Sequence, residues 1–262
     1  MKVFKYSFYL AVAMLRGENC QAQKPKVKSK SITIKVMTYN IRHGVNDNGQ
    51  TNLLRVVELL KKHQPDFVAL QEIDSGATRT GKLNQMRILS MLSGYNEVFF
   101  KSIDFQSGKY GLGILSKHDI ESVQQLKLPN PDSTEPRILA CVSVAFSDSK
   151  YLRFCNTHLD NQSPLNRGLQ AAVINEYLKN SLYPVILGGD FNATAEDHTL
   201  EALTKYWNDA GENTDGATYP SNGKRIDYFW THNESKLKII DYQVLYEPNT
   251  SDHQPVLATY SF

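Results

Sequence analysis

An apolar run at residues 183–187 stops in Gly188 and Gly189, and a carboxylate and a carboxamide follow at Asp190 and Asn192. A short apolar run that ends at glycines predicts a buried strand. Residues two apart on a strand point to the same side, so Asp190 and Asn192 should share a face. Because α/β folds keep their sites at the carboxyl edge of a sheet, this edge is where chemistry is expected.

The same pattern of an apolar run followed by polar residues recurs along the chain. It occurs at Thr38-Tyr39-Asn40, Leu70-Gln71-Glu72, Asn156-Thr157-His158-Leu159-Asp160, Arg225-Ile226-Asp227-Tyr228 and Ser251-Asp252-His253-Gln254-Pro255. Any one of these segments alone could be a solvated strand end or an Asx turn. Together they predict a polar site built from several strand ends.

These motifs, in this order from about residue 36 to residue 262, resemble those of the endonuclease/exonuclease/phosphatase (DNase I-like) superfamily of Mg²⁺-dependent phosphoesterases. The resemblance implies a reaction class more firmly than a substrate. Relatives on this scaffold include DNase I-like nucleases, abasic-site endonucleases, sphingomyelinases, inositol-phosphate 5-phosphatases and tyrosyl-DNA phosphodiesterases. The histidine at position 158 favours the branches other than the abasic-site endonucleases.

Hydrolysis of a phosphate ester needs a cation with hard oxygen ligands, and Mg²⁺ takes only one or two carboxylates. Glu72 is the best single candidate for the ligand of Mg²⁺, with Mn²⁺ as an alternative ion. The resemblance implies that Asn40 supports the metal or a water bound to it. Asp252 is expected to supply a second carboxylate.

The resemblance also implies the catalytic roles. Asp190 orients or deprotonates the attacking water, and Asn192 holds that water and a phosphate oxygen. Asp227 fixes the tautomer of His253 and raises its pKa, while His158 donates a hydrogen bond to a non-bridging phosphate oxygen.

Other charged residues have weaker settings. Arg79, Arg137 and Arg167 are candidates for substrate contacts, and each is equally well explained as a salt-bridge partner, since guanidinium suits both roles. The remaining histidines are expected to be solvated or capping residues; they are His43, His63, His118 and His198.

Residues 32–262 are predicted to form one domain, since no linker, repeat or low-complexity tract divides them. Eleven β-type runs are expected at residues 32–41, 67–72, 97–101, 113–117, 122–128, 138–146, 151–158, 183–187, 226–231, 237–246 and 255–262. Helical periodicity occurs at residues 53–60, 84–92, 165–178 and 200–203. This mixture favours an α/β fold of two packed mixed sheets flanked by helices, the four-layer sandwich of the suspected family.

The first 22 residues place basic, apolar and small residues in the order of a secretory signal peptide, and residues 23–31 read as a flexible leader. We therefore expect a secreted or periplasmic protein without a transmembrane segment. Lipid anchoring through Cys20 is the less favoured alternative. Removal of residues 1–22 leaves equal numbers of acidic and basic residues, so composition supplies no basic face of the kind that DNA-tracking nucleases use.

Cys141 and Cys155 lie almost symmetrically about the turn at residues 147–150. They could form a cross-strand disulfide in an oxidising compartment. Buried free thiols are the favoured interpretation, since free cysteine is among the most buried residue types.

A metal-dependent phosphoric ester hydrolase is the best interpretation. A non-catalytic module of the same fold would not need the complete set of site residues, and a metal-free hydrolase would leave the converging carboxylates without a neutralising cation. The substrate stays open between nucleic acid, a lipid headgroup and a small phosphoester; residues 102–110 and 219–224 are the candidate substrate loops. We expect a monomer without an obligate protein partner.

Overall fold

The computed structural model describes residues 32–262, except for residues 47, 148–149 and 215. The predicted signal peptide and leader, residues 1–31, lie outside the described residues. Among the described residues, no helix has both the length and the apolar character needed to cross a membrane.

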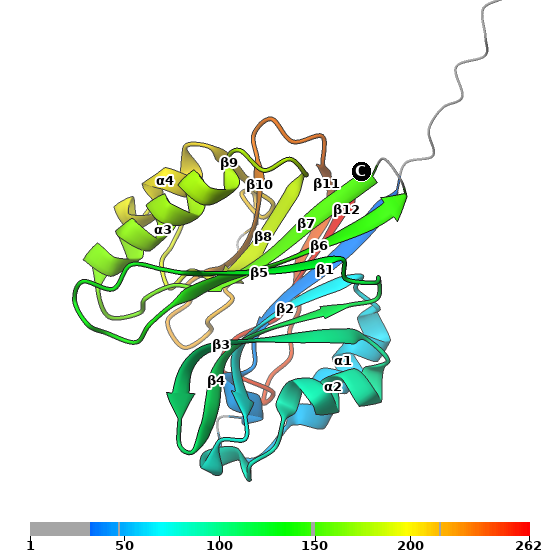
Figure 1. The fold of residues 1–262 in the computed structure, drawn as a ribbon, viewed down its shortest axis with the longest axis vertical. Coiled ribbons are helices and arrows are strands. Elements are labelled where there is room, and N and C mark those ends of the chain that lie inside the picture. The colour runs from blue at the N-terminus through cyan, green and yellow to red at the C-terminus, as the bar shows by residue number, and fades with distance from the viewer. Residues whose placement is uncertain (1–31, 47, 148–149, 215) are drawn as a thin grey trace, which may run out of the picture. The chain divides into compact units, whose positions relative to one another are not determined.

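Two mixed sheets of six strands each form the centre of the domain (Figure 1). The first has the order β11-β12-β1-β2-β4-β3, and its strands are β1 (Thr33–Asn40), β2 (Phe67–Ser75), β3 (Asn96–Phe105), β4 (Gly108–Ser116), β11 (Lys238–Val244) and β12 (Val256–Ser261). The second has the order β5-β6-β7-β8-β10-β9, and its strands are β5 (Ser122–Lys127), β6 (Ile138–Ser147), β7 (Lys150–His158), β8 (Val185–Asp190), β9 (Trp207–Asp209) and β10 (Asp227–His232).

The predicted fold class and all eleven predicted strands are confirmed. The short strand β9 was not expected, because three residues are too few to establish an alternation of apolar and polar side chains. It is defined by its pairing with the end of β10.

Helices cover the outer face of each sheet. The helices α1 (Leu53–His63) and α2 (Gln85–Ser93) cover the first sheet, and α3 (Pro164–Leu178) and α4 (Glu201–Thr204) cover the second (Figure 1). Local sequence sets their ends: Ser163 caps α3 by accepting from the backbone of Asn166, and α1 stops at a left-handed Gln64 before Pro65. Three short 3-10 turns complete the helical elements; they are η1 (Arg42–Gly44), η2 (Thr78–Thr80) and η3 (His198–Leu200).

The core between the sheets is apolar and rich in aromatic side chains. Phe67 of β2 and Phe154 of β7 stack across it with ring centroids 5.2 Å apart. Such packing stabilises the pair beyond the burial of its area and holds the two sheets in one relative position.

Strand register brings the polar strand ends together. The parallel pair β1 and β2 aligns Asn40 with Gln71, next to Glu72. In the second sheet, Asp190 at the end of β8 pairs with His158 on β7 and with Asp227 on β10. The site therefore lies where the carboxyl ends of β1, β2, β7 and β8 meet the start of β10.

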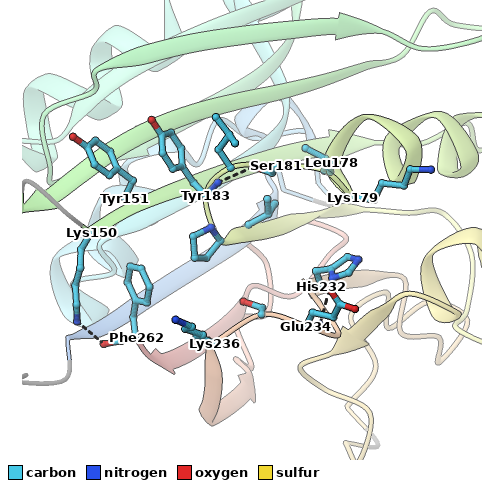
Figure 2. Close-up of a pocket in the computed structure, with 14 residues that line it drawn as sticks. Lys150, Tyr151, Leu178, Lys179, Ser181, Tyr183, His232, Glu234, Lys236 and Phe262 are labelled. Carbon is cyan, nitrogen blue, oxygen red and sulfur yellow. Dashed lines mark hydrogen bonds between the residues drawn. The ribbon is translucent and has the colours of Figure 1, made fainter.

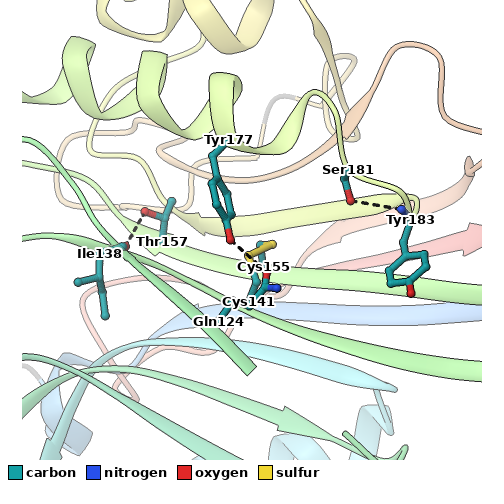
Figure 3. Close-up of a disulfide and its surroundings, with 8 residues drawn as sticks. All are labelled: Gln124, Ile138, Cys141, Cys155, Thr157, Tyr177, Ser181 and Tyr183. Carbon is teal, nitrogen blue, oxygen red and sulfur yellow. Dashed lines mark hydrogen bonds between the residues drawn. A yellow bond between two sulfur atoms is a disulfide. The ribbon is translucent and has the colours of Figure 1, made fainter. Parts of the chain in front are cut away.

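Cys141 and Cys155 form a disulfide, so the prediction of two free thiols is wrong. They are directly paired in the antiparallel register of β6 and β7, with Cα atoms 4.1 Å apart. Both side chains are buried on the outer face of the sheet, beneath the helix that carries Tyr177 (Figure 3). Their direct pairing in this register decides the outcome, because directly opposed residues on one face are neighbours.

Candidate active site

The backbone at the end of β8 requires glycine at position 189. Gly189 has φ +151°, and a Cβ atom there would lie 2.1 Å from the carbonyl oxygen of Thr157 on β7. Only glycine allows this approach. The consequence is that Asp190 is carried close against the end of β7, next to His158.

Oδ2 of Asp190 is the point on which the site converges. Nδ2 of Asn40 donates to it at 3.0 Å, while Nε2 of His158 and Nε2 of His253 lie 3.5 and 3.6 Å away. Only 1% of the Asp190 side chain is exposed. Burial and the nearby carboxylate of Asp227 raise the pKa of Asp190, against the opposing effects of His253 and Asn40. The protonated form of this carboxyl is therefore more favourable than that of a solvent-exposed aspartate.

His253 and Asp227 form a buried pair. Nδ1 of His253 lies 2.9 Å from Oδ2 of Asp227, and both side chains are almost completely enclosed. Burial alone would lower the pKa of His253, but the charges of Asp227 and Asp190 outweigh it and raise the pKa to about 10. The sequence-based pairing of these two residues therefore matches the geometry.

Glu72 is turned toward this cluster by an irregularity in β2. The register between β2 and β4 shifts between Leu70 and Ile73, and Glu72 adopts φ +59°. Bulges of this kind redirect side chains beside active sites. Oε1 of Glu72 accepts from Nδ2 of Asn40 at 3.2 Å. Burial raises the pKa of Glu72, but its contact with His43 and the hydrogen bond from Asn40 outweigh burial and lower the pKa to about 2, so this carboxylate stays ionised.

His43 is a residue that the sequence interpretation misplaced. Its Nδ1 lies 3.7 Å from Oε2 of Glu72, so it is part of the site rather than a solvated or capping residue. Neighbouring Arg42 donates its backbone N–H to Oδ1 of Asn40 at 3.0 Å, and its Nε lies 3.5 Å from Oδ2 of Asp252. Both follow the end of β1 directly, a position that could have identified them.

One cluster among the described residues has the ligand geometry of a divalent-metal site. Asp190, Asp227 and His253 offer ligand atoms that lie within 4.8 Å of one another, and Oδ1 of Asp227 is buried with no hydrogen-bond partner among the described residues. Glu72 and Asp252 are the more accessible carboxylates, with 26% and 28% of their side chains exposed. Asn40 directs its nitrogen at Glu72 and Asp190, so here it orients these two carboxylates.

Asn192 combines a structural contact with a place beside Asp190. Its backbone N–H donates to Oδ1 of Asp190 at 2.9 Å, and its Nδ2 donates to the carbonyl of Leu159 at 3.0 Å. The residue has φ +52°, a conformation that asparagine tolerates better than most. The asparagine therefore locks the turn that presents Asp190.

The three candidate arginines have different surroundings. Arg79 and Arg137 line a cavity of about 240 Å³ together with Glu72 and His158. Arg167 does not line it, and its guanidinium instead donates to Thr199 and to the carbonyl of Asp160, which favours a structural role.

Burial and the charge of Arg137 hold the pKa of His158 well below its usual range, so this ring is neutral.

A larger cavity of about 690 Å³ lies at the opposite ends of the strands. Lys150, Tyr183, His232 and Lys236 are among its lining residues (Figure 2). Lys150 begins β7 and Tyr183 lies just before β8. His232 ends β10, and Lys236 follows it. His158 and Asp190 end β7 and β8, and Asp227 begins β10, so the polar cluster lies at the other ends of these strands and the cavity is separate from the site.

The sequence profile of the Endonuclease/Exonuclease/phosphatase family matches residues 37–253, most of the chain. Among solved structures, a family protein from Bacteroides thetaiotaomicron is 21% identical, with 89% of this chain and 99% of that chain covered and a TM-score of 0.73. A mannosyl-6-phosphatase from the same organism is 21% identical, with 87% and 100% covered and a TM-score of 0.73. The human Nocturnin catalytic domain with bound sulfate anion is 20% identical, with 88% and 94% covered and a TM-score of 0.68. At these identities the structural matches establish a shared fold.

Proposed function

The chain belongs to the Endonuclease/Exonuclease/phosphatase family, and we propose that it is a secreted Mg²⁺-dependent hydrolase of phosphoric esters. The observation that carries this proposal is the convergence on Oδ2 of Asp190, where Asn40, His158 and His253 arrive from separate strand ends. A buried carboxyl whose pKa is raised is suited to accept the proton of an attacking water.

Glu72 is the proposed principal ligand for Mg²⁺ or Mn²⁺, with Asp252 as a second carboxylate. Mg²⁺ retains several waters when bound to protein, so a partly exposed carboxylate suits it better than the enclosed group of Asp190, Asp227 and His253. Within that group, His253 and Asp227 are moreover hydrogen-bonded to each other. When bound, the ion would neutralise charge on the phosphate oxygens.

Asp190 is proposed to position the attacking water and to accept its proton. Asn40 donates to both Asp190 and Glu72, which ties the proton acceptor to the proposed metal ligand. Asn192 supports the same water and a phosphate oxygen, from the turn that its own contacts lock. The rigid placement of these groups contributes to catalysis by positioning.

His253 and His158 are proposed to contact the phosphate with different charges. His253, held protonated by Asp227 and Asp190, supplies a positive charge that stabilises the transition state. His158 is neutral and donates a hydrogen bond to a non-bridging oxygen. The fixed pair of one charged and one neutral imidazole is favourable because neither ring must reorganise during the reaction.

Secretion or export to the periplasm is supported by two features of different kinds. The first 22 residues have the pattern of a signal peptide, and the Cys141–Cys155 disulfide is typical of proteins from oxidising compartments. Lipid anchoring through Cys20 is the less favoured form of the same proposal. We also propose that the protein acts as a monomer.

The test is a panel of phosphoesters assayed with and without Mg²⁺, beside the Asp190→Asn variant. The panel holds plasmid DNA, RNA, phospholipid, inositol phosphates, p-nitrophenyl phosphate and bis-p-nitrophenyl phosphate. We expect metal-dependent hydrolysis of at least one of them and a loss of it in the variant. Absence of hydrolysis across the panel with both Mg²⁺ and Mn²⁺ would refute the proposal.

A further inference from the structure

The cavity of about 240 Å³ opens directly on the proposed phosphate site, because Glu72 and His158 belong to its wall. A substrate with its phosphate between these residues would place the atoms next to the phosphate in this cavity. Its shape and chemistry therefore bear on the substrate class. This reasoning rests on the function proposed above.

The cavity is small. Small-molecule sites usually occupy roughly 300–1,000 Å³, so this one accepts only a compact group. One wall is the hairpin of β3 and β4, which contributes Ile103, Phe105 and Tyr110. Residues 102–110, expected as a substrate loop, thus form strand ends joined by a tight turn. A rigid hairpin makes this wall less able to open for a base-paired duplex.

The fixed charges of the cavity are already compensated. Arg79 makes two hydrogen bonds with the buried carboxylate of Asp74, at 2.8 and 2.9 Å. Nη1 of Arg137 lies 2.9 Å from Oε1 of Glu135. No excess positive charge is therefore left for a second phosphate or for a polynucleotide backbone, and the group that enters here should be neutral.

The cavity nevertheless offers many hydrogen-bonding groups. The side-chain amides of Asn161 and Gln162 are exposed at its edge and make no hydrogen bond to any described residue. Glu135 adds a carboxylate, so donors and acceptors are mixed. Hydroxyl groups, which both donate and accept, match such a lining.

An apolar surface faces these polar groups. Ile103 and Phe105 are half-buried in the cavity wall, and Arg79 lies over the ring of Phe105 at 4.5 Å. A compact molecule that carries hydroxyls on its rim and C–H groups on its faces fits both kinds of surface. We propose that the substrate is the phosphomonoester of a small neutral polyol, of the sugar-phosphate class.

The test compares kcat/KM for a set of aldohexose 6-phosphates with kcat/KM for p-nitrophenyl phosphate and for a short single-stranded oligonucleotide, all with Mg²⁺. We expect at least one hexose phosphate to exceed both others by about tenfold, since it alone uses the polar lining. Hydrolysis of p-nitrophenyl phosphate or of the oligonucleotide without preference for a hexose phosphate would overturn this inference and leave the proposed function standing. Failure with all of these substrates would also overturn this inference, and hydrolysis of another member of the phosphoester panel would still leave the proposed function standing.

Two variants of cavity residues test whether the preference for a hexose phosphate arises in the cavity. Gln162→Ala and Glu135→Gln should each lower the ratio of kcat/KM for the hexose phosphate to that for p-nitrophenyl phosphate, by about fivefold or more. Gln243→Ala, an exposed glutamine on β11, is the matched control and should keep the wild-type ratio. Calorimetric titration of the Asp190→Asn protein with the hexose phosphate should show weaker binding after Glu135→Gln. An unchanged ratio in both cavity variants would contradict the assignment of the cavity.

Discussion

Nδ1 of His253 lies 2.9 Å from Oδ2 of Asp227, although 26 residues separate them in the chain. Asp227 begins β10, and His253 precedes β12 of the other sheet. The pair therefore joins the two sheets at the site, and His253 also faces Asp190. A carboxylate in this position holds the ring orientation and its charge.

This pairing predicts that Asp227 acts through His253. Asp227→Asn and His253→Ala should each lower kcat, and the double variant should lose little more than His253→Ala alone, because residues that act as a unit are not additive. Steady-state kinetics of the four proteins in the cycle measure the coupling. Fully additive losses would show that the two residues work independently.

Glu72→Gln should weaken both activity and the response to Mg²⁺, because a neutral amide is a poorer ligand than a carboxylate. The measurement is a titration of activity with Mg²⁺, in which we expect the midpoint to rise by about tenfold or more. Glu58→Gln, on the exposed side of α1, is the control and should behave as wild type. A Glu72→Gln protein with a normal midpoint and normal turnover would exclude Glu72 as the ligand.

Asp190→Asn should reduce kcat by roughly 100-fold or more while substrate still binds, since the amide cannot accept the proton of the water. Single-turnover kinetics together with equilibrium binding separate the two effects. The exposed Asp119→Asn serves as the matched control. Turnover close to that of wild type would remove Asp190 from the proton transfer.

Loss of the Cys141–Cys155 disulfide should destabilise the domain. The bond closes a loop between residues 14 apart, and a loop of this size is worth about 3 kcal/mol in the chain-entropy account. Urea unfolding of the wild type with and without reductant, and of the Cys141→Ala/Cys155→Ala protein, measures the change. Equal midpoints before and after reduction would argue that the bond adds no stability.

Stability should fall in acid through Asp160. Burial raises the pKa of this carboxyl, but hydrogen bonds from Thr134, Ser163 and Asn166 outweigh it and lower the pKa to about 2. The contribution to stability is thus present above the unfolded pKa of about 4 and is lost as the pH falls from there toward 2.

Asp160→Asn removes this titration. We expect the variant to be less stable than wild type at neutral pH, by on the order of 1 kcal/mol once solvent screening is allowed for, and the gap to close between about pH 4 and 2. Thermal unfolding across that range measures it. A gap that stays constant with pH would assign the acid loss to other carboxyls.

Much of the candidate site was predictable because it lies in local patterns. Alternating apolar residues define strands, and a polar residue directly after a strand reaches the sheet edge whatever the rest of the chain does. Asp190 after Gly188 and Gly189 is the clearest case, since its position depends on a close approach that only glycine permits. Asn40 and His158 follow the same local rule, whereas Glu72 lies inside β2 and reaches the site through the irregularity between Leu70 and Ile73.

What the sequence alone determined is eleven of the strands, the fold class and the polar residues that follow apolar runs. Tertiary structure decided which polar side chains contact one another. Contacts such as His43 with Glu72 and Arg167 with Thr199 depend on how separate elements pack. Register likewise decided that Cys141 faces Cys155. The sequence pointed to parts of the wall of the cavity beside Glu72, namely residues 102–110, Arg79 and Arg137. It did not show that they line one cavity, since these segments meet only after the two sheets have packed together.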